Sequence, residues 1–291
     1  MGSIKVVIYG WDGFTCQIPR IKEAMINHGH ILSENSPDLI YCNDPIEFQK
    51  AINLKKKYPN AFLILNILDI PWHFPNINKL VEVWKSLLIQ ADAITTISEK
   101  VKKDLSQLLN KEIYVIYNPV KDVYYDKKIK KNNMFLYVGR ANDPIKRIGL
   151  VHESLGKIKD GLKNIKICGS ENPGFGNYLG VVPDKKLNEL YNASKYVYLP
   201  SKAEGIGLTM IEAMICGAIP ITCSDNLTAK EFAPKDFICE PNVQSIVDKI
   251  MELNKEYEVK RNLALEFGKK YKIQFNKNKI AENILNIFKS K

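Results

Sequence analysis

Two glutamates and their neighbours form the part of the sequence best suited to chemistry. In "PSKAEGIGLTMIEAMICGAIPIT", residues 200–222, Glu204 and Glu212 stand eight positions apart. Gly205 and Gly207 follow the first glutamate, and the second lies within the otherwise apolar "LTMIEAMI". Glycines at the start of a helix let its backbone N–H groups approach an anion closely. A carboxylate among apolar residues needs hydrogen-bond donors, and the hydroxyl groups of a sugar are suitable donors.

A second group of charged residues lies in "YVGRANDPIKR", earlier in the chain. A predicted strand ends at Gly139, Arg140 follows it, and Lys146 comes at the start of a predicted helix. Two cations in such a place can clamp a diphosphate, and arginine can bind two of its oxygens at once. Each group has a simpler alternative when taken alone. The charged residues of "YVGRANDPIKR" can belong to a solvated loop, and the glutamates of residues 200–222 can lie on the surface at the start of a helix. Because both lie at one predicted sheet edge, a common binding site is favoured.

Alternating strands and helices must position these residues. In the first half, β-branched runs predict strands at "IKVVIYG", "PDLIYC", "AFLILNIL", "DAITTI" and "EIYVIYN", with helices over 17–28, 45–57 and 76–90 and a further helix capped by Ser98. In the second half, strands are predicted at "MFLYVG", "NIKICG", "YVYLP" and "AIPIT", with helices from about 147, over 184–194 and after Gly207, and a helical C-terminal region. Such alternation predicts parallel sheets covered by helices on both faces, with ligands at the carboxyl ends of the strands.

The chain is long enough for two domains of this kind. We predict a Rossmann-like N-terminal domain over residues 1–121 and a Rossmann-like C-terminal domain over 134–274. Between them, residues 122–133 are rich in lysine, show no buried face and are interpreted as a linker. Residues 275–291 are predicted to form a final helix.

The composition indicates a cytoplasmic protein with free thiols. No apolar run approaches the roughly 18 residues of a membrane span, and the N-terminus lacks a signal-peptide pattern. The six cysteines include no Cys-x-x-Cys pair and no histidine partners at zinc spacing.

The net charge of +10 is concentrated in two short segments. Residues 121–131 hold five lysines and two aspartates, and residues 269–291 hold seven lysines and one glutamate. An anionic acceptor or contact with an anionic membrane surface is therefore one hypothesis, and the lysine-rich usage of an AT-rich genome is the alternative. No aromatic and basic stripe typical of nucleic-acid binding accompanies the charge, so no stable nucleic-acid partner is expected.

These motifs together resemble the retaining glycosyltransferases of family 4, which have the GT-B fold. "AEGIGLTMIEAMICGAIPI" is similar to the E-x7-E signature of that family, and "VGR", a short loop and then lysine is similar to its diphosphate clamp. "NHGHIL", "ADAITTISEKVKKDL", "IYNPV" and "GVVPDKKLNELYNASKYVYLPS" resemble further elements in the family order. The resemblance implies an α/β fold of two Rossmann-like, doubly wound domains that face each other across a cleft, with the C-terminal helix returning to the N-terminal domain.

The resemblance also implies roles for the charged residues. Arg140 and Lys146 would bind the diphosphate of a nucleotide sugar, Glu204 the transferred sugar and Glu212 the ribose hydroxyls. Val182 and Asp184 correspond to a region of the family that contacts the base, and the backbone of Gly205, Ile206, Gly207 and Leu208 would contact the phosphate and sugar. Gly139 and Gly13 are further substrate-binding residues that the resemblance implies. Gly13 belongs to "YGWDGFTCQIP", which replaces the glycine-rich loop that the family usually carries after its first strand.

One family feature is missing from the N-terminal half. The family commonly has a histidine immediately before an aspartate after the third long strand, and this sequence has Leu68 and Asp69 there. His73, in "IPWHFP", and Asp69 are both candidates for the catalytic group of this half.

The resulting hypothesis is retaining transfer of a hexose from a UDP- or GDP-linked sugar to a hydroxyl acceptor by front-face attack. Neither a cofactor nor a metal ion is expected, because protein cations neutralise the leaving group and no Asp-x-Asp motif is present. Two alternatives stay open: a sugar-nucleotide-binding protein with weak catalysis, and a glucosyltransferase that modifies nucleic acid.

Overall fold

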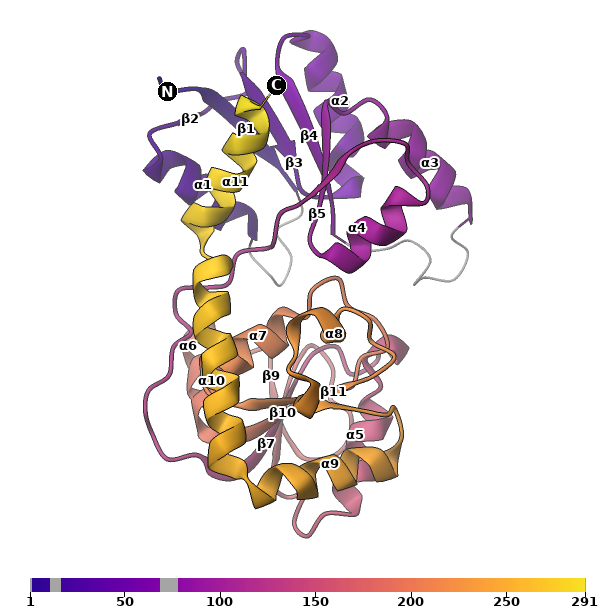
Figure 1. Ribbon diagram of the computed structural model, residues 1–291, viewed down its shortest axis with the longest axis vertical. Helices are drawn as coiled ribbons and strands as arrows, with labels where there is room; N and C mark the ends of the chain where they lie inside the picture. Colours follow the sequence, from indigo (N-terminus) through magenta and orange to yellow (C-terminus); the bar gives the residue numbers. More distant parts are fainter. Residues whose placement is uncertain (1, 11–16, 69–77, 291) are drawn as a thin grey trace. The chain divides into compact units, whose positions relative to one another are not determined.

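The computed structural model describes residues 2–10, 17–68 and 78–290, which form two compact units (Figure 1). The N-terminal unit comprises Met1–Pro119 together with Gln274–Lys291, and the C-terminal unit comprises Val120–Ile273. Each unit contains a six-stranded sheet.

The N-terminal unit is built on a parallel sheet of order β2-β1-β3-β4-β5-β6. Its strands are β1 (Lys5–Tyr9), β2 (Ile31–Leu32), β3 (Leu39–Cys42), β4 (Phe62–Ile67), β5 (Ala93–Thr96) and β6 (Ile113–Val115). Its helices are α1 (Gln17–Asn27), α2 (Phe48–Lys57, preceded by a 3-10 turn at Pro45–Glu47), α3 (Asn78–Leu88), α4 (Glu99–Ser106) and α11 (Lys277–Lys289). Alternate residues of β1 enter different cores: Val7 packs with the α2 side and Val6 with the α1 side. The predicted two-faced sheet is confirmed.

Helix α11 closes one face of this unit. Ile280, Ile284 and Leu285 are buried in the same core as Ile21 of α1. Lys277 and Glu23 form an ion pair of 2.7 Å beside that core. The predicted return of the C-terminal helix to the N-terminal domain is therefore confirmed.

The C-terminal unit has a second parallel sheet, of order β12-β11-β10-β7-β8-β9. Its strands are β7 (Asn132–Val138), β8 (Ile165–Cys168), β9 (Asn177–Gly180), β10 (Ser194–Leu199), β11 (Ile219–Cys223) and β12 (Ile238–Cys239). Its helices are α5 (Ile148–Gly156), α6 (Asp184–Ala193), α7 (Leu208–Ile215), α8 (Ala229–Phe232), α9 (Val243–Lys255) and α10 (Tyr257–Gln274), with 3-10 turns at Pro144–Lys146 and Lys235–Phe237. This is the doubly wound arrangement predicted for the second half.

The segment predicted as a linker packs against the C-terminal unit. We expected no buried face, but Tyr124 is 1% exposed and Lys131 is buried as well. The Lys131 Nζ donates to the carbonyls of Tyr191, Asn192 and Cys216 at 2.8–3.0 Å, so a lysine caps the ends of α6 and α7. Lysine can be buried in this way because its long stem is apolar and the carbonyls satisfy its donors.

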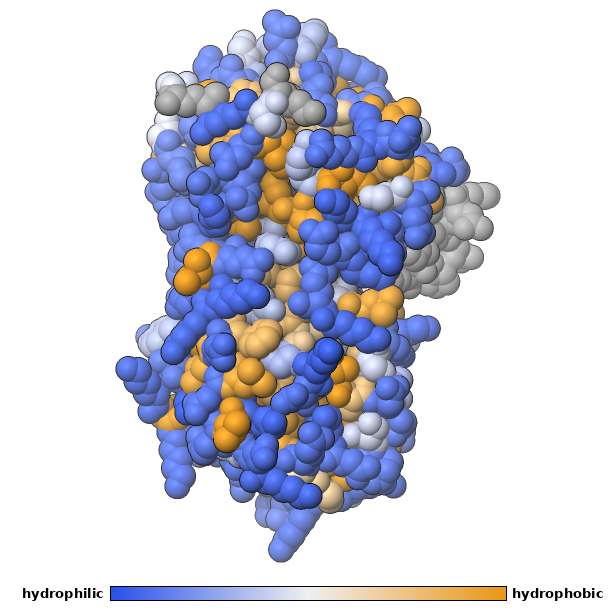
Figure 2. Space-filling model, in the orientation of Figure 1, coloured by the Kyte–Doolittle hydropathy of each residue, from blue (hydrophilic) through white to orange (hydrophobic). Residues whose placement is uncertain are grey.

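Helices of the described residues are too short or too polar to span a membrane. The face shown in Figure 2 is covered largely by hydrophilic residues.

Candidate functional site

The sheet order of the C-terminal unit brings the two predicted charged groups to one edge. β7 and β10 are hydrogen-bonded neighbours, and from them the chain continues to strands on opposite sides of the sheet. Loops that follow such a pair diverge at the carboxyl ends of the strands, which is where doubly wound sheets bind their ligands. Arg140 lies directly beyond β7, and Glu204 lies beyond β10.

Lys146 and Glu204 are in direct contact at this edge. The Lys146 Nζ lies 2.5 Å from the Glu204 Oε1, and the two side chains are only 20% and 14% exposed. The backbone holds their loops together, since the N–H of Lys202 donates to the carbonyl of Ile145 at 2.8 Å. A second contact fixes Glu204, whose carbonyl accepts from the hydroxyl of Thr228 at 2.6 Å. Two predicted residues from distant parts of the sequence thus form one charged pair.

Arg140 stands beside this pair on a short, well-braced loop. Its side chain is 53% exposed and donates to the Asp143 carboxylate at 2.6 Å. The other oxygen of Asp143 accepts from the N–H of Ile145 at 3.0 Å and caps the 3-10 turn that ends at Lys146. A guanidinium has five N–H donors, so Arg140 can bind Asp143 and still donate to a ligand.

The same loop contains a second arginine that the sequence analysis did not assign to the site. Arg147 has a left-handed backbone conformation with a φ of 50° and makes a two-pronged ion pair with Asp225. This pair lowers the pKa of the Asp225 carboxyl, chiefly through the hydrogen bond. It ties the loop after β7 to the loop after β11. The available signal for this role was the rarity of arginine, because only four of the 42 basic residues are arginines and Arg147 is one of them.

Helix α7 begins at the same edge with an uncapped N-terminus. Gly207 is its N-cap residue, has a φ of 69° and, lacking a side chain, makes no side-chain cap hydrogen bond to the first N–H groups. Glycine suits this position because φ is positive and because an added Cβ would lie 3.3 Å from Leu199 Cδ2. Before it, Gly205 is half-buried and Ile206 is buried, and Leu208 is the first residue of the helix. Such a helix start favours an anionic ligand.

Glu212 lies in α7 between residues that are buried. Its helix neighbours Ile211, Ala213 and Met214 are buried, whereas Glu212 itself is half-buried. The hydroxyl of Tyr191 on α6 donates to the Glu212 Oε2 at 3.0 Å. Burial, together with the charge of Glu212, raises the pKa of Tyr191 well above its usual value, so this hydroxyl remains a donor. This role could not be predicted from the sequence, because a tyrosine at helical spacing is typical of a core residue.

Asp184 and Val182 lie where α6 begins. The Asp184 carboxylate accepts from Lys121 Nζ at 2.5 Å and from the Tyr124 hydroxyl at 3.3 Å. Tyr124 in turn packs edge-on against Tyr191, with ring centroids 5.6 Å apart. Val182 is half-buried two residues earlier. Asp184 is therefore linked through the two tyrosines to Glu212.

The backbone at Gly139, just after β7, packs closely against the end of the neighbouring strand. Its N–H donates to the carbonyl of Cys168 at 3.0 Å. On the neighbouring strand, a Cβ added to Gly169 would lie 2.0 Å from the carbonyl oxygen of Gly139. The Tyr137 hydroxyl would lie 3.2 Å from a Cβ on Gly139 itself. The lack of a side chain at Gly169 thus lets the two strand ends lie close together, next to the loop of Arg140.

Gly13, Asp69 and His73 lie outside the described residues, and their assignments stay predictions. At the described carboxyl edge of the N-terminal sheet, polar side chains form a buried chain of hydrogen bonds. Asn43 donates to Gln17 at 3.1 Å, Asn66 donates to Asn43, and Thr95 donates to Asn66 at 2.7 Å. Within residues 2–10, 17–68 and 78–290, no three His, Cys, Asp or Glu side chains are grouped to hold a metal ion.

Comparisons with known proteins support the resemblance found in the sequence. Residues 176–271, which include both glutamates, match the model of the family described as "Glycosyl transferases group 1". O-antigen chain mannosyltransferase B of Escherichia coli is 30% identical over 117 residues, 40% of this chain and 30% of that protein. The poly(ribitol-phosphate) alpha-N-acetylglucosaminyltransferase of Staphylococcus aureus is 24% identical over 296 residues, 89% of this chain and 57% of that protein. The family resemblance is confirmed, and this chain spans less than two thirds of the length of either relative.

The fold is similar to that of solved structures. The crystal structure of Anabaena HepE in complex with UDP and glucose superposes with a TM-score of 0.79 at 16% identity, covering 99% of this chain and 100% of that chain. The GT-B fold class predicted from the sequence is confirmed.

Proposed function

We propose that this chain is a retaining glycosyltransferase that transfers a hexose from a UDP- or GDP-linked sugar to a hydroxyl acceptor without a metal ion. The observation that carries the proposal is the pairing of Lys146 with Glu204 at the strand-end edge of the C-terminal sheet, beside Arg140 and the uncapped start of α7. Cations and the N–H groups of a helix start match the anionic diphosphate of a sugar nucleotide, and a carboxylate beside them matches the hydroxyl groups of its sugar.

The cations act on the leaving group. When the bond between the anomeric carbon and the diphosphate oxygen breaks, negative charge accumulates on the diphosphate. Arg140, Lys146 and the N–H groups at the start of α7 are fixed where they stabilise that charge, which lowers the barrier to transfer. The acceptor oxygen then bonds to the same face of the anomeric carbon, and its proton passes to a diphosphate oxygen.

Glu204 and Glu212 act on hydroxyl groups. The Glu204 carboxylate shares the ammonium of Lys146, so the lysine can contact a bound phosphate while the carboxylate accepts from the sugar. Glu212, oriented by Tyr191, accepts from the two ribose hydroxyls. Val182 and Asp184, at the start of α6, contact the base.

The comparisons support a uridine donor and a polymeric acceptor. HepE crystallised with UDP and with UDP-glucose, which supports a uridine donor. The two relatives are an O-antigen chain mannosyltransferase and a poly(ribitol-phosphate) alpha-N-acetylglucosaminyltransferase, which supports a polyhydroxylated polymer as acceptor.

The experiment is a donor panel with a stereochemical readout. The chain is incubated with UDP- and GDP-linked glucose, mannose and N-acetylglucosamine and an alcohol acceptor, with and without EDTA. One donor is expected to release nucleotide at the same rate in EDTA and to give a product of unchanged anomeric configuration by NMR. An inverted product, or dependence on a divalent ion, would contradict the proposal. Binding without release would favour the sugar-nucleotide-binding alternative.

A further inference from the structure

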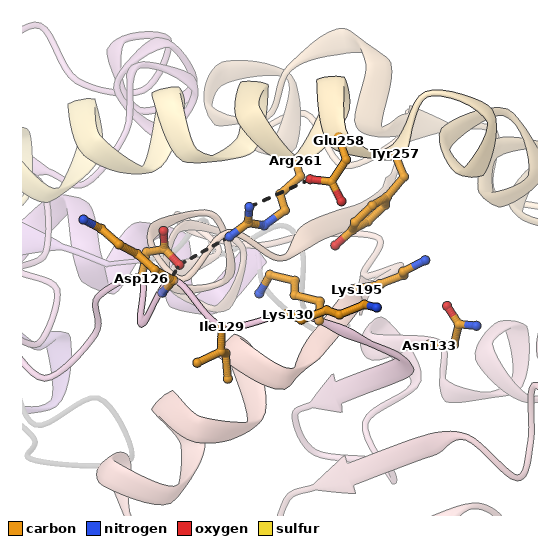
Figure 3. Close-up of a pocket in the computed structure, with 10 residues that line it drawn as sticks. Asp126, Ile129, Lys130, Asn133, Lys195, Tyr257, Glu258 and Arg261 are labelled. Atoms are coloured by element: carbon orange, nitrogen blue, oxygen red, sulfur yellow. Dashed lines mark hydrogen bonds and ion pairs between the residues drawn. The ribbon is translucent and has the colours of Figure 1, made fainter.

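A cavity lies at the edge of the C-terminal sheet opposite the candidate site, near the strand starts. It has a volume of about 550 Å³ and is lined by residues of three segments: the stretch that leads into β7, the start of β10 and the start of α10. Figure 3 shows Lys130, Lys195, Tyr257 and Arg261 gathered around it. Its volume is within the range of small-molecule sites.

This cavity is distinct from the candidate site. Asn133 lines it at the start of β7, and Arg140 lies beyond the other end of the same strand. A seven-residue strand is about 23 Å long, at about 3.3 Å per residue. A ligand in this cavity is therefore not the sugar nucleotide at the carboxyl edge.

The basic residues that line the cavity outnumber the acidic ones, so some of the lysines have no acidic partner. Five basic and two acidic residues line it. The two acids are both used by Arg261, which approaches Asp126 at 3.5 Å and Glu258 at 4.0 Å. The Nζ of Lys131 is already used by three carbonyls. Among the described residues, the remaining lysines of the lining, Lys128, Lys130 and Lys195, form no ion pair.

Two buried polar atoms in the lining also lack a partner within the described chain. They are the hydroxyl oxygen of Tyr257 and the Nε of Arg261. Lys195 lies over the Tyr257 ring, with its Nζ 4.4 Å from the ring centroid, so the ammonium and the hydroxyl belong to one cluster. A buried hydroxyl without a partner costs free energy and is unusual unless a ligand or water completes it.

We propose that this cavity is a binding site for a small, multiply charged phosphate compound, separate from the sugar-nucleotide site. Lys130 and Lys195 supply the charge, and the Tyr257 hydroxyl supplies a hydrogen bond to a phosphate oxygen. The side-chain amide of Asn133 is a further neutral donor in the wall. The lining is concave and lies between α10 and the stretch before β7, which suits a small soluble molecule and not a flat membrane surface.

Pyrophosphate is the probe, titrated by calorimetry into a full-length background that carries Arg140→Gln and Lys146→Met. This background removes the proposed diphosphate clamp, so the result does not depend on the proposed function. One binding site is expected to remain. Adding Lys130→Gln and Lys195→Gln should weaken it about tenfold or more, because each charge-assisted hydrogen bond is worth more than a neutral one.

Two further variants separate a built site from general attraction. Lys159→Gln with Lys163→Gln removes the same charge from exposed positions of the same unit, outside the cavity, and should change the affinity less than twofold. Tyr257→Phe should bind pyrophosphate several-fold more weakly while the free protein melts no lower than wild type, because the lost hydroxyl has no described partner. Equal weakening by both lysine pairs, unchanged binding in the cavity variants, or binding only to vesicles of anionic lipid would overturn the proposal.

Discussion

Glu204 and Lys146 lie 58 positions apart in the chain and form a 2.5 Å ion pair at the strand-end edge of the C-terminal sheet. Both side chains are mostly buried, so neither charge is well hydrated. A bound diphosphate would accept hydrogen bonds from Lys146, and a bound sugar would donate hydrogen bonds to Glu204, in place of the water that these side chains lack. The following predictions test this edge and the fold that supports it.

Replacing Lys146 should remove stabilisation of the leaving diphosphate. We expect Lys146→Met to lower kcat/KM by about 10²–10³, comparable to the loss of one fixed charge-stabilising group. The assay is nucleotide release from the donor found in the panel, with the melting temperature as the check on folding. Lys202→Met, an exposed lysine on the adjoining loop, is the matched control and should stay within about threefold of wild type. Equal losses in both variants would remove the special role of Lys146.

Removing the hydroxyl of Tyr191 should affect binding more than turnover. This hydroxyl donates to Glu212, so Tyr191→Phe should raise the KM of the donor by about threefold to tenfold and leave kcat nearly unchanged, as expected for one hydrogen bond. Tyr198→Phe, at a buried tyrosine whose hydroxyl contacts Ser154, is the control and should leave both constants unchanged. A fall in kcat with unchanged KM would contradict the role given to Tyr191.

Adding a methyl group at Gly207 should destabilise the start of α7. The φ of 69° and the nearby Leu199 side chain both disfavour alanine, so we expect Gly207→Ala to lower the free energy of unfolding by about 1–2 kcal/mol. Urea denaturation measures this change. Gly149→Ala is the control, because that glycine is in helix α5 with open space around it, and should be neutral or stabilising. Equal effects of the two substitutions would contradict the geometric argument.

The buried Lys131 should make stability depend on pH. Burial lowers its pKa to about 7, whereas an unfolded lysine titrates near pH 10.4. Between these values the unfolded chain binds a proton that the folded chain does not, so the free energy of unfolding should rise with pH from about 7 to 10.

Urea denaturation at pH 7, 8 and 9 measures this slope. Lys131→Met should reduce the slope by about 1 kcal/mol per pH unit, close to the limit for a single proton. Lys130→Met, at the exposed neighbouring lysine, should keep the slope of wild type. Identical slopes in all three proteins would contradict the assignment.

The sequence predicted the long elements well and the short ones poorly. Strands such as β4 and β10 contain apolar runs, at residues 62–65 and 196–199, which are typical of a sheet buried on both faces. β2 and β12 have two residues each, too few for any periodic signal, and they were missed. The helix cap at Ser98 was predicted, and its side chain accepts from the N–H of Val101 at 3.2 Å.

The candidate site was predictable by residue type but not by contact. Glycines, carboxylates and cations beside strand ends indicated Arg140, Lys146 and Glu204, because parallel strands end at one edge. The pairing of Lys146 with Glu204 depends on the order of the strands, which no local spacing gives. The contact between Tyr191 and Glu212 depends in the same way on how α6 packs beside α7.

The central claim is that the C-terminal unit binds a sugar-linked nucleoside diphosphate through the edge formed by Arg140, Lys146, Glu204 and Glu212. Calorimetric titration of UDP and GDP into wild type, Lys146→Met, Glu212→Gln and Lys202→Met tests it most directly. We predict that one of the two nucleotides binds wild type and Lys202→Met alike and binds the other two variants at least tenfold more weakly, a loss of about 1.4 kcal/mol or more. Equal affinity in all four proteins, or binding of neither nucleotide to wild type, would contradict the account.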